Sequence, residues 1–214
     1  MPELPEVETT VRQLKNAVVG KTLRGFWTDW AKYVKPMSAK AFGKAVVGRK
    51  ILNVSRRGKN ILFSLSGGPP ASGPEAGEAG KTMLIHQKLT GHLLVGKWKL
   101  RRRKQVPVRN GAMRDRVNTY IHLLFDLNGK QLALSDLRKF GKVRLYSSSE
   151  VDKAPDLALG PDPLIMSYDE FTRVLKKRKT RIKALLLDQT AIAGIGNIYS
   201  DEILWLAKVH PLKS

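Results

Sequence analysis

The sequence contains no cysteine. Disulfide bonds and thiolate-ligated zinc are therefore excluded within these 214 residues, and the chain carries no redox signature of its own. No stretch approaches the ~20 apolar residues that a membrane-spanning helix needs. The N-terminus also lacks the basic and apolar regions of a signal peptide. We therefore expect a cytoplasmic protein with no membrane partner.

Acidic residues are scarce relative to basic ones. The chain has 39 Lys and Arg against 18 Asp and Glu, a formal net charge of +21. Self-repulsion of this size disfavours a compact state unless a polyanion or salt screens it. The balance predicts a nucleic-acid partner, with an anionic membrane surface as the competing explanation. The length allows one large or two small domains.

The apolar pattern changes along the chain from a helical period to short strands. Val7, Val11, Leu14 and Val18 fall on one helical face, and Gly20 follows as a stop signal. Many short β-rich runs separated by turn residues then indicate a β-sandwich. These runs cover residues 51–54, 61–65, 83–86, 93–98, 120–127, 131–134 and 143–146.

Two long interruptions break the strand pattern. Residues 66–80 are rich in Gly, Pro, Ala and Glu, which predicts a mobile surface loop. Residues 97–116 hold nine basic residues and one acid, which predicts a loop that faces a polyanion. A solvated basic loop without specific contacts explains any single side chain there equally well.

The last third of the chain has helical signals. Residues 147–163 are rich in Pro and Gly and resemble a hinge or linker. A capping box formed by Ser167 and Glu170 then starts a helix through Leu175. A second helix is predicted over residues 181–188, and a third follows the Gly-rich turn at 193–197 and ends at about residue 208.

The fold class that follows is α+β. An N-terminal helix and β-sandwich domain occupies residues 1–146, a linker covers 147–163, and a helical domain covers 164–214.

The N-terminal residues offer amine chemistry. Pro2 permits removal of Met1, which leaves a secondary amine. A free α-amino group titrates near ~8, so far more of it is unprotonated at neutral pH than of a lysine near ~10.4. Attack on a sugar C1′ gives a cationic iminium that promotes elimination of the 3′ phosphate, with Glu3 and Glu6 in reach as acid and base. Spacing alone favours the simpler alternative, in which the prolines stiffen the start of a helix and the acids favour its dipole.

A resemblance changes this balance. The opening decapeptide closely resembles that of the bacterial formamidopyrimidine-DNA glycosylase family, and further stretches match in the same order. The matching stretches are residues 1–10, 56–60, 86–91, 135–141, 194–202 and His210-Pro211. The resemblance implies a base-excision repair enzyme that removes oxidised purines, such as 8-oxoguanine and formamidopyrimidines, and then cleaves the abasic strand through a Schiff base. The implied partner is double-stranded DNA with an oxidised purine or an abasic site, bound by a monomer.

The resemblance also implies roles for single residues. Pro2 corresponds to the nucleophile, and Glu3 to the acid that acts on the deoxyribose ring oxygen and the glycosidic bond. Glu6 helps to position the site. Lys59 matches a lysine that contacts the phosphate beside the lesion, although a solvated turn residue would have the same spacing.

Three further residues match those that fill the space left by the flipped-out base, namely Leu89, Arg138 and Phe140. An apolar wedge and a guanidinium offset the stacking that is lost when a nucleotide is extruded. Without the resemblance, ordinary core packing would be the better explanation of the two apolar residues.

The helical domain resembles the family's helix-two-turns-helix motif, in which Asn197 contacts the backbone of the damaged strand and Lys183 lies near by. The backbone amides of the Gly-rich turn and the helix dipole are expected to hold a phosphate. Asn197 is also a good N-cap, which is the simpler explanation. The four histidines are too dispersed to predict a metal site.

The sequence departs from the family in several places. Leu89 replaces a usual methionine and Lys139 a common arginine. Relatives continue into a four-cysteine zinc finger, so no cofactor is expected in this chain, which stops at Ser214. We therefore expect broad DNA binding and poor excision of 8-oxoguanine. A non-catalytic damaged-DNA-binding remnant of the family remains the alternative function, and a basic RNA-binding protein is a more distant one.

Overall fold

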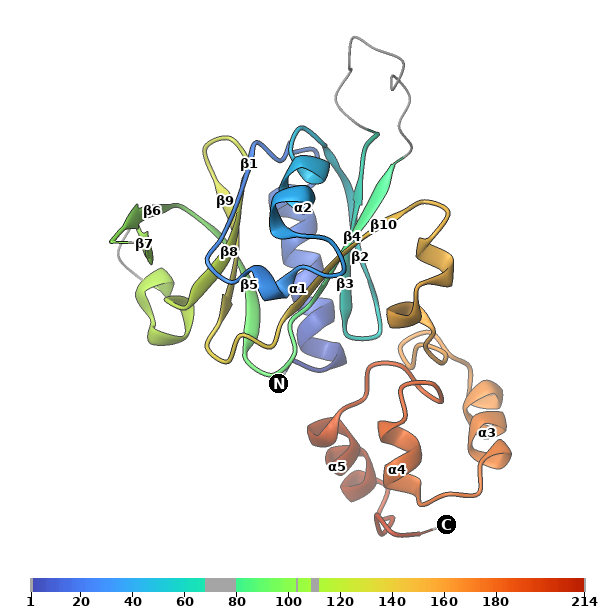
Figure 1. Ribbon diagram of the computed structural model, residues 1–214. Helices are drawn as coiled ribbons and strands as arrows, with labels where there is room; N and C mark the ends of the chain where they lie inside the picture. Colours follow the sequence, from blue (N-terminus) through green and yellow to red (C-terminus); the bar gives the residue numbers. More distant parts are fainter. Residues whose placement is uncertain (1, 68–79, 103, 109–111, 214) are drawn as a thin grey trace.

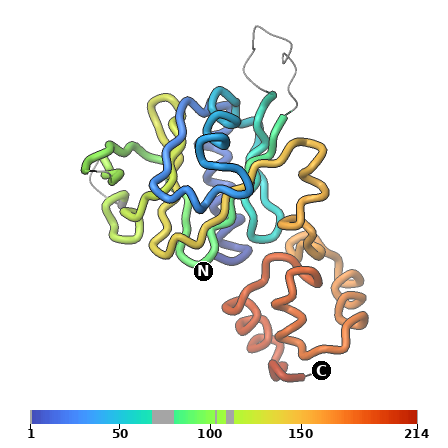
Figure 2. The backbone as a smooth tube through the Cα atoms, viewed as in Figure 1, coloured from blue at the N-terminus to red at the C-terminus, as the bar shows by residue number. Residues whose placement is uncertain are grey.

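The computed structural model describes residues 2–67, 80–102, 104–108 and 112–213. It has a β-rich part followed by a helical part (Figure 1). The chain begins beside the helical part, so residues from its two ends meet (Figure 2).

The first helix, α1 (Leu4–Val18), carries the predicted apolar face. The side chains of Leu4, Val7, Val11, Leu14 and Val18 are all buried. Pro5 lies in the first turn, where a missing amide hydrogen costs nothing because that amide has no partner within the helix. The prediction of a helix close behind the N-terminus is confirmed.

Eight strands form two antiparallel four-stranded sheets, which confirms the predicted β-sandwich. The first sheet has the order β1 (Gly25–Thr28), β8 (Ile121–Asp126), β9 (Gln131–Asp136) and β5 (Gly91–Gly96). The second has the order β10 (Lys142–Ser147), β4 (Lys81–His86), β3 (Asn60–Leu65) and β2 (Ile51–Arg57). In the second sheet His86 pairs with Asn60 on one side and with Lys142 on the other.

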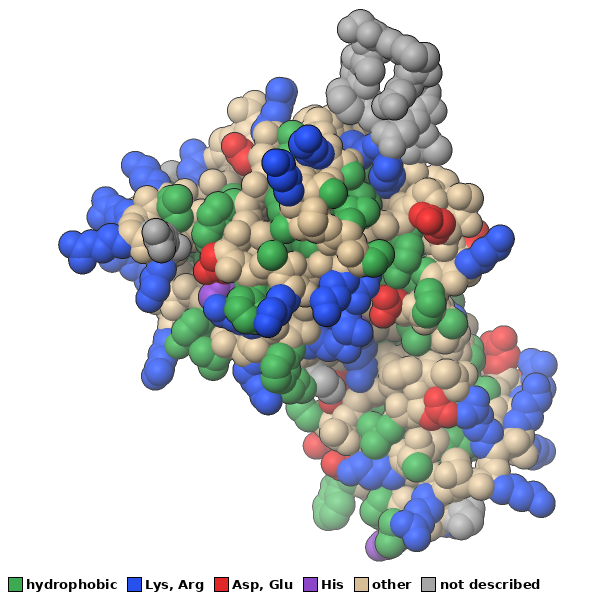
Figure 3. Space-filling view, viewed as in Figure 1, with side chains coloured by type: hydrophobic (Ala, Val, Ile, Leu, Met, Phe, Trp, Pro, Cys, Tyr) green, Lys and Arg blue, Asp and Glu red, His purple; other side chains and the backbone are tan. Residues whose placement is uncertain are grey.

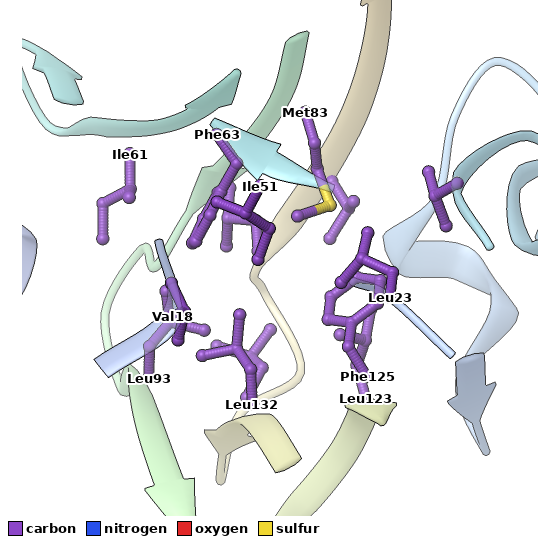
Figure 4. Close-up of a cluster of buried hydrophobic side chains, with 14 of the residues drawn as sticks. Val18, Leu23, Ile51, Ile61, Phe63, Met83, Leu93, Leu123, Phe125 and Leu132 are labelled. Carbon is purple, nitrogen blue, oxygen red and sulfur yellow. The ribbon is translucent and has the colours of Figure 1, made fainter. Parts of the chain in front are cut away.

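The main core fills the space between these sheets, with α1 and α2 (Ala39–Val46) lying there as well (Figure 1). Phe63 and Met83 from one sheet face Phe125 and Leu132 from the other, with Val18 of α1 beside them (Figure 4). Burying a large apolar side chain contributes roughly 1.5–3 kcal/mol, so this cluster supplies most of the stability of the β-rich part.

Three elements differ from the sequence prediction. Strand β1 was not predicted. It is half-buried along its whole length, so its sequence shows neither an alternation of buried and exposed residues nor a continuous apolar run. Helix α2 was not predicted either. Its N-cap is Ser38, whose hydroxyl accepts a hydrogen bond from the Ala41 amide at 3.2 Å.

The third difference is a correction to the predicted loop over residues 97–116. Strands β6 (Trp98–Arg101) and β7 (Lys104–Pro107) form an antiparallel hairpin there. Trp98 is buried against Ile121 and Leu124, which anchors the hairpin despite its charge. The mobile loop predicted for residues 66–80 falls largely on 68–79, which lie outside the described residues.

The helical part contains α3 (Tyr168–Lys177), α4 (Ile182–Leu187) and α5 (Asn197–Leu206). The predicted capping box is present: Ser167 Oγ accepts from the Glu170 amide and Glu170 Oε2 accepts from the Ser167 amide. Helix α5 ends two residues before the predicted limit, because Lys208 has a left-handed φ of 54°. Within the described residues no helix is long and apolar enough to cross a membrane.

Residues 147–163 do not form a free hinge, because side chains of the β2–β3 hairpin fasten them. Arg56 forms an ion pair with Asp162, and Arg57 donates a hydrogen bond to the Leu159 carbonyl. Asn60 Nδ2 donates to the carbonyl of residue 156 at 2.8 Å. Arg56 Nε also donates to Glu8 Oε2 of α1 at 2.6 Å, so one buried guanidinium connects α1, the hairpin and the linker.

Candidate active site

The carboxylate of Glu3 lies at the junction of the β-rich and helical parts. Its side chain is buried, and its oxygens accept hydrogen bonds from the amides of Gly196 at 2.8 Å, Ile198 at 2.9 Å and Tyr199 at 3.2 Å. The Leu4 amide also donates to the Gly194 carbonyl at 3.1 Å. The start of α1 is therefore docked on the N-terminus of α5, where a negative charge also complements the helix dipole.

This docking requires glycine in the turn before α5. A Cβ atom at position 196 would lie 2.3 Å from Glu3 Cδ, and one at 194 would lie 2.6 Å from Leu4 Cδ1. Gly194 also has a φ of +94°, which other residues rarely adopt. The sequence predicted that the amides of this turn and the helix dipole hold a phosphate, but the Gly196 amide of the turn and two amides in the first turn of α5 hold the Glu3 carboxylate instead.

Glu6 reinforces the same contact. Its Oε2 accepts from the Glu3 amide at 2.9 Å, and its Oε1 accepts from the Tyr199 hydroxyl at 3.1 Å. This hydrogen bond raises the pKa of Tyr199 above its ordinary value. Pro2 precedes Glu3 directly and is half-buried, whereas Met1 lies outside the described residues. Tyr199 stood in a matching stretch of sequence, but nothing in that stretch signalled its bond to Glu6.

Lys59 lies in the two-residue turn between β2 and β3, next to this site. Burial lowers its pKa below the ordinary value, Glu3 opposes the shift, and Lys88 adds to it. His86 lies in the same group of charges, and its pKa falls to about 4 through burial and then through Lys88, Lys59 and Lys142. Lys59 therefore lies within electrostatic range of Glu3. Lys88 and Lys142, which the sequence did not single out, belong to the same group of charges.

The three proposed wedge residues lie on two neighbouring turns. Leu89 and Phe140 are 36% and 50% exposed, which argues against core packing. The guanidinium of Arg138 stacks on the Phe140 ring, 4.6 Å from its centroid.

Thr90 and Asp136 join these two turns. The Thr90 hydroxyl donates to Asp136 Oδ1 at 2.6 Å and accepts from the Arg138 amide at 3.0 Å. Asp136 is fully buried, and its other oxygen accepts from the Gly141 amide and the Tyr33 hydroxyl. Asp136 therefore fixes the two turns relative to each other, a role that the sequence did not reveal.

Lys183 and Asn197 both lie in the helical part. Lys183 Nζ pairs with Asp201 Oδ1 at 2.5 Å, so an acid competes with a phosphate for this charge. Asn197 is exposed and is the first residue of α5, whereas Gly196 holds the N-cap position. The simpler explanation of Asn197 as the N-cap is therefore wrong.

Lys and Arg side chains gather on the β6–β7 hairpin and along the face where the β-rich part meets the helical part (Figure 3). Among the described residues, no group of three or more His, Asp and Glu is placed to hold a metal ion. The junction therefore carries positive charge around one fixed carboxylate. This arrangement suits a polyanion that is bound through its phosphates and reacts at another atom.

Comparison with known proteins identifies related chains. The family model of the formamidopyrimidine-DNA glycosylase N-terminal domain matches residues 1–143, and that of the formamidopyrimidine-DNA glycosylase H2TH domain matches residues 159–214. The formamidopyrimidine-DNA glycosylase of Herpetosiphon aurantiacus is 38% identical over 219 residues, which cover 100% of this chain and 70% of that protein. The corresponding protein of Chloroflexus aggregans is 40% identical and is covered to 68%.

Solved structures of similar fold are complexes with DNA. The Fpg protein of Lactococcus lactis bound to DNA containing an abasic site aligns with a TM-score of 0.78 at 30% identity, covering 100% of this chain and 69% of that one. A complex of the same protein with DNA containing N7-benzyl-Fapy-dG aligns with the same score at 31% identity, covering 70% of that chain. The chain described here belongs to the formamidopyrimidine-DNA glycosylase family of DNA-repair enzymes.

Proposed function

We propose that this chain removes oxidised purines, formamidopyrimidines and, at a low rate, 8-oxoguanine, from double-stranded DNA and then cleaves the strand at the resulting abasic site. The observation that carries the proposal is the position of Glu3, which three amides hold in one orientation directly after Pro2. A carboxylate fixed beside a terminal secondary amine suits general acid–base chemistry on the sugar that the amine attacks.

The amine requires that Met1 be removed, because a retained methionine would turn the Pro2 nitrogen into an amide. The nitrogen lone pair of Pro2 then attacks C1′, and the C1′–base bond breaks as the base leaves with its electrons and takes up a proton. Loss of the amine proton leaves C1′ bonded to both the Pro2 nitrogen and the ring oxygen. The nitrogen lone pair then forms the C1′=N⁺ iminium as the C1′–O4′ bond breaks and O4′ takes up a proton, for which Glu3 is the acid. Removal of a C2′ proton then breaks the C3′–O bond and releases the 3′ phosphate.

Other residues bind and orient the substrate in this scheme. Lys59 contacts the phosphate beside the lesion, and Asn197 and Lys183 contact the backbone of the damaged strand. Leu89, Arg138 and Phe140 fill the space that the extruded nucleotide leaves. The amine and the carboxylate need no cofactor. Without cysteine the chain cannot supply a four-thiolate zinc site, and no step is assigned to a metal.

The test is trapping of the iminium by borohydride on a duplex with an abasic site, combined with the intact mass of the protein. A mass without Met1 and a covalent product are expected for the wild type. Pro2→Gly is expected to impair trapping severely while duplex binding stays nearly unchanged. Equal trapping by this variant would exclude Pro2 as the nucleophile. Unimpaired DNA binding without trapping by the wild type would favour a non-catalytic DNA-binding protein.

Glu3→Gln separates the two reactions. We expect it to suppress base excision more than cleavage at a preformed abasic site, because the acid is needed most where the glycosidic bond breaks. A parallel fall in both rates would instead indicate that the variant disturbs the docking of α1 on α5.

A further inference from the structure

Three lysines outside the Glu3 contact lie together at one end of the second sheet. Lys59 is in the turn that precedes β3, and Lys142 is the first residue of β10. Lys88 follows the end of β4, whose last residue, His86, pairs across the sheet with Lys142. The antiparallel register therefore brings residues from three separate strands to a single edge.

The backbone at Lys88 is held in place. Its φ is 58°, a left-handed conformation, and its amide donates to His86 Nδ1 at 2.9 Å. The next turn is closed by a hydrogen bond of 3.0 Å from the Gly91 amide to the carbonyl of Gln87, whose side chain is buried. Lys88 is half-buried, so its side chain starts from a fixed point.

The charges at this edge are poorly balanced. Burial lowers the pKa of Lys88, Lys142 and Arg144 lower it further, and Asp156 opposes them. Asp156 already accepts a hydrogen bond from the Tyr146 hydroxyl at 3.1 Å and faces Arg144 at 3.8 Å. Half-buried ammonium groups that repel one another gain most from an anion that contacts several of them at once.

The edge also adjoins the proposed active site. Gly58 lies so close to the Gly-rich turn that a Cβ atom there would be 3.7 Å from the Gly194 amide nitrogen. Gly194 in turn accepts the hydrogen bond from Leu4, the residue after Glu3. Leu89, which directly follows Lys88, is the proposed wedge. The edge therefore adjoins both the proposed wedge residue and the turn that contacts Leu4.

We propose that Lys88 and Lys142 form a second phosphate-binding subsite, beside Lys59, for the backbone of the strand that carries the damaged nucleotide. The proposal rests on the proposed function for the identity of the strand. A phosphodiester fits the edge because it offers two charged oxygens to separate ammonium groups.

The test uses Lys88→Asn, since asparagine tolerates a left-handed φ. Lys208→Asn is a matched control: Lys208 is exposed, has a φ of 54°, and lies beyond the other end of α5. Affinity is measured against salt concentration for a duplex with a tetrahydrofuran abasic analogue, which cannot form an iminium. Loss of one phosphate contact lowers the slope of log affinity against log salt by about 0.9. We expect this change in Lys88→Asn and Lys142→Gln, with affinity reduced roughly tenfold.

Lys208→Asn is expected to change neither the slope nor the affinity. Lys88→Asn with the wild-type slope would overturn the proposal, whether or not affinity falls, because a phosphate contact cannot be lost without releasing fewer counterions. Failure of the wild type to trap abasic DNA would count against the proposed function alone, since the salt slope does not depend on turnover.

Discussion

Glu3 and Gly196 are 193 residues apart in sequence, yet Glu3 Oε2 accepts a hydrogen bond of 2.8 Å from the Gly196 amide. This bond joins the first helix to the last and places Pro2 at the junction of the β-rich and helical parts. Because the contact uses the backbone amide of residue 196, a side chain introduced there would affect the contact only through its size.

Gly196→Ala is therefore expected to displace Glu3, since the new Cβ would lie 2.3 Å from Glu3 Cδ. A displacement of about 1 Å at a reacting group lowers rates by roughly 100-fold. The rate of iminium trapping on an abasic duplex measures the effect. Gly25→Ala is the control, because a Cβ atom there would be in ordinary contact with Asp126 at 3.5 Å. Equal rates for the two variants would contradict the proposed importance of the Glu3 position.

Arg56→Met is expected to destabilise the fold by about 3 kcal/mol, because it leaves the carboxylate of Asp162 half-buried without its cation. Arg12→Met removes another cation from the shared partner Glu8, but the Arg12 side chain is 75% exposed. A surface pair of this kind contributes only about 0.3–0.5 kcal/mol. Urea unfolding of both variants measures the difference, and similar losses would show that Arg56 does not fasten the linker.

The ion pair between Arg56 and Glu8 also predicts that the stability of the fold depends on pH. Hydrogen bonds from Arg12 and then from Arg56 lower the pKa of Glu8 below its ordinary value of 4.5. A carboxylate with a lowered pKa stabilises the fold above its ordinary pKa, and the contribution is lost as the pH falls through the lowered value. The stability gap between wild type and Arg56→Met should therefore narrow below about pH 4.5.

His86 is a base, whereas Glu8 is an acid, and its protonation changes the stability of the fold over a different pH range. Its pKa in the folded chain is about 4, below the ordinary 6.5, so the unfolded chain binds the proton more readily between these values. Stability is complete above pH 6.5 and falls as the pH decreases towards 4, by a total on the order of 3 kcal/mol. His86→Asn keeps an acceptor for the Lys88 amide and should lack this fall. The free energy of unfolding of both proteins is measured between pH 4 and 7. An equal dependence on pH in the two proteins would contradict the assignment.

Phe140→Ala is expected to leave stability within about 0.5 kcal/mol, because half of the side chain is already exposed. It should reduce the preference for an abasic-analogue duplex over an intact duplex several-fold, since less apolar surface fills the vacated space. Competition binding measures this preference. Leu52→Ala, at a position 54% exposed on β2, is the control and should keep the preference.

The sequence predicted elements whose signals are local. Val7, Val11 and Leu14 repeat with the period of a helix, and α1 follows it. Ser167 and Glu170 mark the start of α3, because both partners of a capping box lie within one turn. The strands of the two large sheets were mostly predicted within two residues of their ends, with β1 as the exception.

Elements that depend on distant contacts escaped prediction. The β6–β7 hairpin forms because Trp98 packs against Ile121. The basic residues beside Trp98 in the sequence do not indicate this contact. The amides before α5 were expected to bind phosphate, since an amide cluster attracts any anion and the sequence does not show that Glu3 fills it. Resemblance supplied the candidate residues of the site, but their mutual contacts depend on tertiary structure.

The fastening of the linker has a mechanical consequence. Arg56, Arg57 and Asn60 all project from one short hairpin and grip the chain between the sheets and the helices. Rotation of one part against the other would break a buried ion pair and several hydrogen bonds together. Under the proposed function, we therefore expect the bound duplex to bend rather than the protein. Steps that are already unstacked, as at an abasic site, bend with the least elastic energy. Under the proposed function, we expect recognition of damage to depend on the bending stiffness of the DNA before any contact with the base.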